Sequence, residues 1–397
     1  MDDSILVVNC GSSSLKLAIF DGNLENRATA LAERLNTENA TAKVHMGDQQ
    51  PVPLPANADH HAALVTLIEH LRSAGVLQAA PRAIGHRVVH GGEDFTDAAL
   101  ITAEVIEAID RCSALAPLHN PVNLVGIDAA RTLFPEVPQV AVFDTAFHQS
   151  LPPKAFHYAL PRRFYRDWGV RRYGFHGTSH QFMASEAARL LGQPVEQTSI
   201  ISAHLGNGCS ITAIRDGRSV DTSMGLTPLE GLVMGTRSGD IDPGLFDFLM
   251  GKGLSAKEVH RTLNQDSGLL GLSGETNDMR ALGERAEAGH AGCQLAIDVF
   301  CFRLARYIGA MMASLDKLDA LVFTGGIGEN SAPVRAQTLS HLALMGFRLE
   351  PAANASHGRQ NDQRISGADS RFPILVIPTN EELVIARSAR DHGQRSG

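Results

Sequence analysis

The feature that most constrains the fold is an internal repeat of a strand, a short polar turn and a second strand. Residues 5–11 read Ile-Leu-Val-Val-Asn-Cys-Gly, and the strand after them ends at Asp21-Gly22. Residues 200–206 read Ile-Ile-Ser-Ala-His-Leu-Gly, and the strand after them ends at Asp216-Gly217. The two Asp-Gly pairs are 195 positions apart (216 minus 21), about half of the 397 residues. The repeat predicts a duplicated domain, although two unrelated hairpins can also look alike by chance.

Strand and helix patterns alternate along the rest of the chain. Short apolar runs flanked by polar residues predict strands at 5–8, 15–20, 88–89, 140–143, 199–203, 211–214 and 321–324. Apolar residues at helical spacing predict helices at 59–74, 179–191, 290–315 and 332–345. This alternation predicts an α/β fold whose sheet edges present loops to ligands.

Composition excludes several classes of partner. The net charge of −8 argues against general binding to nucleic acid or to an anionic membrane. No apolar run reaches the roughly 20 residues of a membrane span, and no signal peptide is visible. The five cysteines form no C-x-x-C pair, so we expect small buried thiols and a cytoplasmic protein. The basic, aromatic stretch at 162–173 is expected to position the following loop or to contact a subunit, rather than to bind nucleic acid.

Three glycine-rich turns follow apolar strands, at 9–16, 204–208 and 324–330. Such turns leave backbone N–H groups free to face phosphate oxygens, and Lys16 adds a positive charge. Any one of them could be glycine-rich for structural reasons alone, but three together favour a nucleotide. The chain has no G-x-x-x-x-G-K-[ST] motif, so a P-loop is not expected.

Arginine and histidine gather in four further segments, at 85–92, 117–121, 173–180 and 235–243. A phosphoryl group in transfer needs cations beside its equatorial oxygens, and arginine offers a planar, two-pronged donor. Each histidine taken alone could instead be a core residue, which is the preferred interpretation for His60, His61, His70 and His260. Asp144 follows the strand at 140–143, a place where a carboxylate can hold Mg²⁺ or act in catalysis but can equally cap the next helix.

Together these segments resemble the acetate kinase family, short-chain carboxylate kinases of the actin-like ATPase superfamily, from Ile5 to about Arg387. The resemblance implies two duplicated actin-like (ribonuclease H-like) domains with an active-site cleft between them, and a homodimer. The expected first domain covers 1–146 and 379–397, where the C-terminal helix closes it. The expected second domain covers 147–378 and carries the nucleotide-binding loops. The implied cofactor is Mg²⁺, with Mn²⁺ as an alternative, and the implied substrates are ATP or ADP and acetate or acetyl phosphate.

The resemblance also assigns individual residues. Catalytic positions fall on Arg87, His119, Asp144, His176 and Arg237, with Arg87 binding the carboxylate. The metal positions fall on Asn9 and Glu381. Val89, Leu118, Phe175 and Pro228 correspond to the pocket for the acetate methyl group. The ATP contacts correspond to Lys16, His204, Leu205, Gly206, Asn207, Gly208, Asp278, Met279, Arg280, Gly325, Gly326, Ile327, Gly328 and Glu329. The chain departs from the family at Cys10, where a small residue such as alanine is usual, and at 272–277.

Elementary acid–base chemistry refines one of these roles. A carboxylic acid with a pKa of about 4 to 5 is already ionised at neutral pH, so its phosphorylation requires no base. We therefore expect Asp144 to serve a magnesium site, although the family usually labels it a proton acceptor. Two other functions stay open at this point: a propionate or butyrate kinase, and an actin-like nucleotide-dependent binding module.

Overall fold

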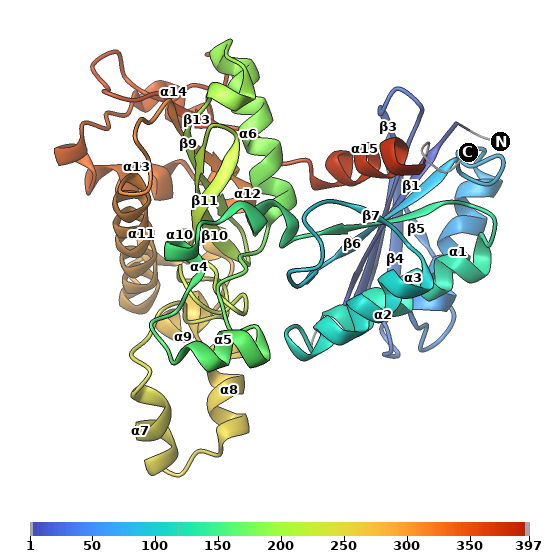
Figure 1. The fold of residues 1–397 in the computed structure, drawn as a ribbon. Coiled ribbons are helices and arrows are strands. Elements are labelled where there is room, and N and C mark those ends of the chain that lie inside the picture. The colour runs from blue at the N-terminus through green and yellow to red at the C-terminus, as the bar shows by residue number, and fades with distance from the viewer. Residues whose placement is uncertain (1–2, 118, 394–397) are drawn as a thin grey trace. The chain divides into compact units, whose positions relative to one another are not determined.

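The chain forms two compact units in the computed structural model, which describes residues 3–117 and 119–393. The first unit is Met1–Gln149 with Asn380–Gly397, and the second is Ser150–Thr379. Each unit is built around its own β-sheet with helices packed against it (Figure 1).

The first unit contains an eight-stranded mixed sheet in the order β5-β4-β3-β2-β1-β6-β8-β7. Its strands are β1 (Ile5–Gly11), β2 (Ser14–Phe20), β3 (Asn26–Glu33), β4 (Thr41–Met46), β5 (Asp48–Val52), β6 (Ala83–Val88), β7 (Ala99–Leu100) and β8 (Gln139–Phe143). Its helices are α1 (His60–Ser73), α2 (Ala103–Arg111), α3 (Asn120–Leu133) and α15 (Glu381–Gly393). Alternation of side chains along β1 divides the core: Leu6 and Val8 pack with α1 and α3, whereas Ile5 and Val7 pack with α15.

The second unit contains a five-stranded sheet in the order β11-β10-β9-β12-β13. Its strands are β9 (Ile200–Leu205), β10 (Cys209–Arg215), β11 (Arg218–Thr222), β12 (Ala320–Thr324) and β13 (Ile374–Val376). Figure 1 shows the long helices α6 (Gly177–Leu191) and α11 (Ala291–Met312) on either side of it. The other helices are α4 (Pro153–Phe156), α5 (Arg162–Trp168), α7 (Leu245–Gly251), α8 (Ala256–Gln265), α9 (Gly268–Ser273), α10 (Met279–Glu287), α12 (Gly325–Asn330), α13 (Ala332–Ser340) and α14 (Pro351–Ala355).

The two sheets share one topology over five strands. The order β3-β2-β1-β6-β8 in the first unit matches β11-β10-β9-β12-β13 in the second. In both, the first three strands are antiparallel to one another and the last three are parallel. An offset of 195 residues carries Ser14–Phe20 of β2 onto Cys209–Arg215 of β10. The expected duplication and α/β class are therefore confirmed.

Several expected boundaries were wrong. Strand β1 continues through Gly11 and β2 begins at Ser14, so the turn expected over 9–14 contains only Ser12 and Ser13. The strand expected at 88–89 is β6, which ends at Val88. The helix expected over 332–345 ends at Ser340, and a separate 3₁₀ turn covers Ala343–Met345. Leu344 is fully exposed there, so its apolar spacing does not correspond to a buried helix face.

Candidate functional site

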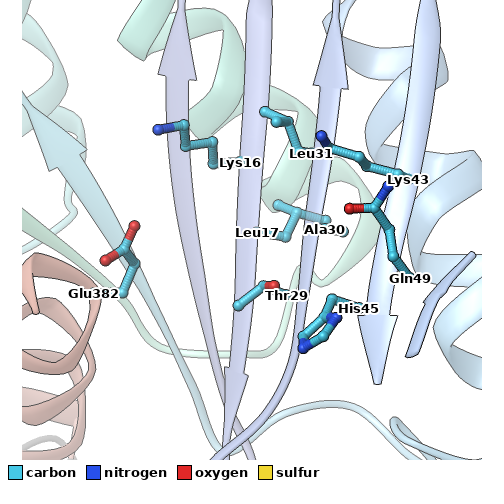
Figure 2. A pocket seen from close by; sticks show the side chains of 9 residues that line it. All are labelled: Lys16, Leu17, Thr29, Ala30, Leu31, Lys43, His45, Gln49 and Glu382. Atoms are coloured by element: carbon cyan, nitrogen blue, oxygen red, sulfur yellow. The ribbon is translucent and has the colours of Figure 1, made fainter. Parts of the chain in front are cut away.

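In the first unit, the predicted metal and phosphate residues lie together on the β1–β2 ladder. Asn9 pairs directly with Lys16, so the two side chains project from the same face of the sheet. Lys16 also lines a cavity of about 370 Å³ over β2, β3, β4 and β5 (Figure 2). The cavity holds a second lysine, Lys43, and an acidic side chain from α15, Glu382. The charged side chains that line this cavity are therefore two lysines, Lys16 and Lys43, and one glutamate, Glu382.

Arg87 and Asp144 form a paired group at the ends of neighbouring parallel strands. Arg87 lies on β6 and Asp144 directly follows β8. The guanidinium donates through Nε to Oδ1 at 2.9 Å and through Nη2 to Oδ2 at 2.6 Å. The Asp144 side chain is only 2% exposed and that of Arg87 is 23% exposed. This two-pronged, charge-assisted contact fixes the plane of the Arg87 guanidinium.

Glu381 opens helix α15 and belongs to the same acidic and basic cluster. Burial raises the pKa of Glu381 to about 7; the charge of Arg87 opposes the rise, and Asp144 and Glu382 add to it. Three carboxylates are therefore brought close enough to influence one another. Crowding of this kind favours either a proton or a bound cation.

The histidines of the segment 85–92 are core residues rather than cations. His86 is 2% exposed and its Nε2 lies 2.8 Å from Gln139 Oε1. His90 is fully buried, and its Nδ1 accepts a hydrogen bond from the Gly92 N–H at 3.0 Å. Burial lowers the pKa of each imidazole to about 4, so both are neutral at pH 7. Of the described residues in that segment, Arg87 is the one whose side chain is paired with the predicted site residue Asp144.

Two other predicted residues of the first unit, Val89 and His119, lie at positions that also support the fold. Val89 is buried, and its N–H donates to Asn123 Oδ1 at 3.0 Å. His119 is the N-cap residue of α3. Leu118 lies outside the described residues, so its predicted place in the methyl pocket stays a prediction.

In the second unit, His176 and Arg237 converge beside Gly208. A Cβ built on Gly208 would lie 3.1 Å from Arg237 Nη2 and 3.4 Å from His176 Nε2, which places both donors next to the β9–β10 turn. His176 is the N-cap residue of helix α6 and has φ of 56°, a left-handed backbone conformation that is uncommon for residues other than glycine. Its Nδ1 lies 2.9 Å from Ser210 Oγ, and its ring stacks on His204 at 4.4 Å.

Arg237 is held by the loop that carries Pro228. Its Nη1 donates to the Pro228 carbonyl at 2.6 Å, and burial lowers the pKa of its guanidinium. Phe175, the residue before His176, is buried within this unit. Two of the predicted substrate residues are thus tied to the two predicted donors: Phe175 directly precedes His176, and the Pro228 carbonyl accepts a hydrogen bond from Arg237.

A cavity of about 630 Å³ in the second unit gathers many of the predicted ATP contacts. It is lined by side chains and backbone from β9–β10, α10, α11, α12 and α13. Seven predicted residues line it: Gly206, Asn207, Asp278, Met279, Arg280, Gly326 and Ile327. Its size falls within the roughly 300–1,000 Å³ of ordinary ligand sites.

The cavity also shows what the sequence reasoning missed. Asn277 lines it, and its Nδ2 donates to Asn207 Oδ1 at 2.9 Å. Glu284, Glu287, Ile297, Asn330, Ser331, Pro333 and Val334 line it as well. Asn277 directly precedes the predicted Asp278, and Asn330 ends the glycine-rich segment 324–330, so these two had a sequence signal. Asp278 itself caps α10 by accepting the Ala281 N–H at 2.8 Å, so its carboxylate has a structural task there.

Comparison with known proteins places the whole chain in one group. The model of the Acetokinase family matches residues 4–387. The acetate kinase of Chromobacterium violaceum is 53% identical over 389 residues, covering 97% of each chain. A propionate kinase from Francisella tularensis has a TM-score of 0.93 at 44% identity, covering 98% of this chain and 99% of that one. The acetate kinase of Porphyromonas gingivalis has a TM-score of 0.91 at 38% identity, with the same coverage.

Proposed function

Because this chain belongs to the acetokinase family, we propose that it transfers the γ-phosphoryl group of ATP to acetate, giving acetyl phosphate and ADP. The high identity to a curated acetate kinase over nearly the full length of both chains carries this proposal. The reaction is reversible and proceeds by direct in-line transfer.

The nucleotide is assigned to the cavity of the second unit. Gly206 and Gly326 present backbone to it, and Asn207 and Arg280 also line it, with Arg280 Nε donating to Glu284 Oε1 at 3.1 Å. Lys16 in the first unit supplies a further charge for the phosphates. Together these groups provide what a nucleoside triphosphate requires: an open, partly apolar pocket and positive charge near its phosphates.

The Mg²⁺ of the reaction is assigned to Asn9, Asp144 and Glu381. Their donors are amide and carboxylate oxygens, the ligands that Mg²⁺ prefers alongside water and phosphate. The pKa of Glu381 is raised chiefly by burial and further by the charges of Asp144 and Glu382, and a bound cation would offset both effects. When bound, Mg²⁺ would neutralise phosphate charge, and Mn²⁺ has similar ligand preferences.

The protein groups act on the two reacting partners by binding and by charge. Arg87 holds the acetate carboxylate in our proposal, and Asp144 keeps its guanidinium oriented. One acetate oxygen attacks the γ-phosphorus, the bond from that phosphorus to the β–γ bridging oxygen breaks, and ADP leaves. Arg237 and His176 donate to the equatorial oxygens, where charge is spread in the transition state. No proton need be removed from acetate, which is already ionised.

We propose that Val89, Leu118, Phe175 and Pro228 limit the substrate to a methyl group. A sibling activity toward propionate is the nearest alternative, because a propionate kinase is among the similar solved structures.

We also propose that the protein acts in the cytoplasm and that it forms a homodimer. In the described part of the chain no helix is long and apolar enough to cross a bilayer, and all five cysteines are buried and free.

Formation of ADP that depends on acetate tests the proposed function, with the variant Arg237→Ala as the matched negative control. The wild type should turn over ATP only when acetate is present. Arg237→Ala should lose about a thousandfold in kcat, as enzymes do without an arginine finger, while keeping its thermal midpoint. An unchanged kcat in a folded Arg237→Ala protein would remove Arg237 from the mechanism.

A further inference from the structure

Glu329 carries contacts that its place in the nucleotide loop does not explain. It lies in helix α12, which directly follows strand β12 and presents Gly326, Ile327 and Asn330 to the nucleotide cavity. Glu329 is not among the residues that line that cavity. Its Oε1 instead accepts two backbone N–H groups, from Gly325 at 3.0 Å and from Thr379 at 3.0 Å.

The first of these contacts fixes the start of the loop. Gly325 has φ of 76°, and a Cβ there would lie 2.7 Å from the Leu205 carbonyl oxygen, so the backbone is tightly confined. The Thr324 side chain makes no capping bond at the start of α12. The Glu329 carboxylate supplies the missing acceptor by reaching back from the last turn to the first.

The opposite end of the loop is held by a buried arginine. Arg335 is fully buried, and its Nη1 donates to the carbonyls of Gly328 at 2.7 Å and Glu329 at 3.1 Å. Its Nε and Nη2 donate to Asn354, at 2.8 and 2.9 Å. Both ends of α12 are therefore fixed by side chains, Glu329 and Arg335, that do not line the cavity.

The second Glu329 contact leads to the predicted catalytic histidine. Thr379 Oγ1 lies 3.1 Å from Ser179 Oγ, and Ser179 is fully buried. Ser179 Oγ lies 2.8 Å from His204 Nδ1, and the His204 ring stacks on His176. Hydrogen bonds thus run from the nucleotide loop through Thr379 and Ser179 to His204, and ring stacking joins His204 to His176, all within the second unit.

We infer that Glu329 and Thr379 are positioning residues: Glu329 holds the nucleotide loop without contacting the nucleotide, and Thr379 links that loop through Ser179 to His204 and His176. This rests on the proposed function and changes the role of Glu329, which the family resemblance places among the ATP contacts. This role requires an acceptor oxygen at position 329 and a hydroxyl at position 379. It does not require a negative charge on the side chain at position 329.

Calorimetric titration with Mg²⁺–ADP tests the role of Glu329 without requiring turnover. Glu329→Gln keeps an acceptor oxygen of the same reach and should bind ADP within about threefold of the wild type. Glu329→Met has no acceptor, leaves two backbone N–H groups unpaired, and should weaken ADP binding at least tenfold, the effect of about 1.4 kcal/mol. Glu258 provides the control, because its carboxylate accepts the Ser255 N–H at 2.7 Å at the start of α8, a helix that does not line the cavity. Glu258→Met should reduce thermal stability but leave ADP binding unchanged.

Two outcomes overturn the role of Glu329: Gln weakening ADP binding as much as Met does, or Met leaving it unchanged. Wild-type protein that binds no ADP would instead contradict the nucleotide assignment itself, so the two failures can be told apart.

Steady-state kinetics tests the link through Thr379. Thr379→Val should lower kcat at least fivefold with the KM for ATP unchanged, and Thr379→Ser should restore kcat. Thr198→Val is the matched control, because the buried Thr198 hydroxyl donates to the Pro194 carbonyl at 2.9 Å away from this path. Equal kcat in the Thr379→Val and Thr198→Val proteins would show that the path has no part in positioning His176.

Discussion

At the scale of single residues, the pairing of Arg87 with Asp144 bears most directly on the chemistry. A buried carboxylate is costly unless it is paired and hydrogen-bonded, and Arg87 satisfies both oxygens of Asp144. Each of those oxygens keeps a second lone pair, so the contact does not prevent Asp144 from also serving a metal. The structure thus pairs Arg87, the predicted carboxylate-binding residue, with Asp144, which we expect to serve the metal and the family usually labels a proton acceptor.

Replacing Asp144 by asparagine separates the two roles proposed for it. Asp144→Asn should lose most activity, and raised Mg²⁺ or Mn²⁺ should restore part of it if Asp144 serves the metal. The measurement is kcat across a metal titration, with Arg87→Ala as the control that metal should not rescue. A flat response in Asp144→Asn would favour the proton-acceptor role.

The buried histidines of the first unit make its stability sensitive to acid. A folded pKa of about 4 for His90, against about 6.5 in an unfolded chain, means that only the unfolded state takes up this proton between those values. Stability is therefore fully present above pH 6.5 and is lost as the pH falls toward 4, by up to about 3 kcal/mol for this group.

Replacing His90 by asparagine should flatten that dependence. The Asn side-chain oxygen can accept the Gly92 N–H in place of Nδ1, and it does not titrate. Urea unfolding followed by circular dichroism at pH 7, 6 and 5 measures the slope, and His61→Asn, at an exposed position of α1, should leave it unchanged. An equal slope in His90→Asn and wild type would show that His90 does not titrate in this way.

At the scale of elements, the β9–β10 turn sets where His176 and Arg237 stand. The turn is tight because Gly206 N donates to the Gly208 carbonyl at 3.1 Å, and Gly208 leaves room for both donors. A methyl group at position 208 would push on the ends of flexible side chains and not on the backbone. The fold should therefore tolerate the change although the site should not.

Gly208→Ala should lower kcat by about three- to tenfold, because the Arg237 guanidinium must shift by only a few tenths of an ångström, whereas a shift of about 1 Å in a catalytic group costs about a hundredfold. The KM for ATP should change little. Gly251→Ala on α7 is the control, since nothing lies within 4 Å of a Cβ there. Equal kcat values for Gly208→Ala and Gly251→Ala would show that the placement of His176 and Arg237 beside Gly208 does not affect catalysis.

Elements with strong patterns could be predicted from the sequence, and weakly patterned ones could not. The runs of Ile, Leu and Val predicted β1, β2, β8, β9, β10 and β12, and helical spacing predicted α1, α6 and α11. The alternating residues of β3 that face the core are Ala28, Ala30 and Ala32. Alanine has a low preference for strands and a weak apolar signal, so β3 went unpredicted, as did β4 and β5, which follow it toward the edge of the sheet.

The contacts that organise the site were harder to foresee than its motifs. Motif resemblance pointed to seven residues that line the nucleotide cavity, because their spacing within short segments is distinctive. Arg335 and Asn354 hold the nucleotide loop from 19 positions apart, and Thr379 meets Glu329 from 50 positions away. Such long-range hydrogen bonds depend on the packed fold and leave no local pattern in the sequence.

At the scale of the whole molecule, the duplicated topology has been used for different tasks in the two units. The first unit groups Arg87 of β6, Asp144 after β8 and Glu381 at the start of α15. The second inserts α7 to α11 between β11 and β12, and α10 and α11 form part of the nucleotide cavity. One ancestral arrangement of strands has therefore acquired a carboxylate- and metal-handling half and a nucleotide-handling half in our account.

The central claim is that acetate is the substrate, and the kcat/KM values for acetate and propionate test it most directly. ATP is supplied in excess, each carboxylate is varied in turn, and the acyl phosphate formed is trapped with hydroxylamine. One methylene in an apolar pocket is worth roughly 1–3 kcal/mol, so acetate should exceed propionate by about ten- to two-hundredfold, and butyrate should be poorer again. Val89→Ala, which trims one wall, should raise the propionate-to-acetate ratio. A wild-type kcat/KM for propionate or butyrate that equals the value for acetate would contradict the account and favour a propionate or butyrate kinase.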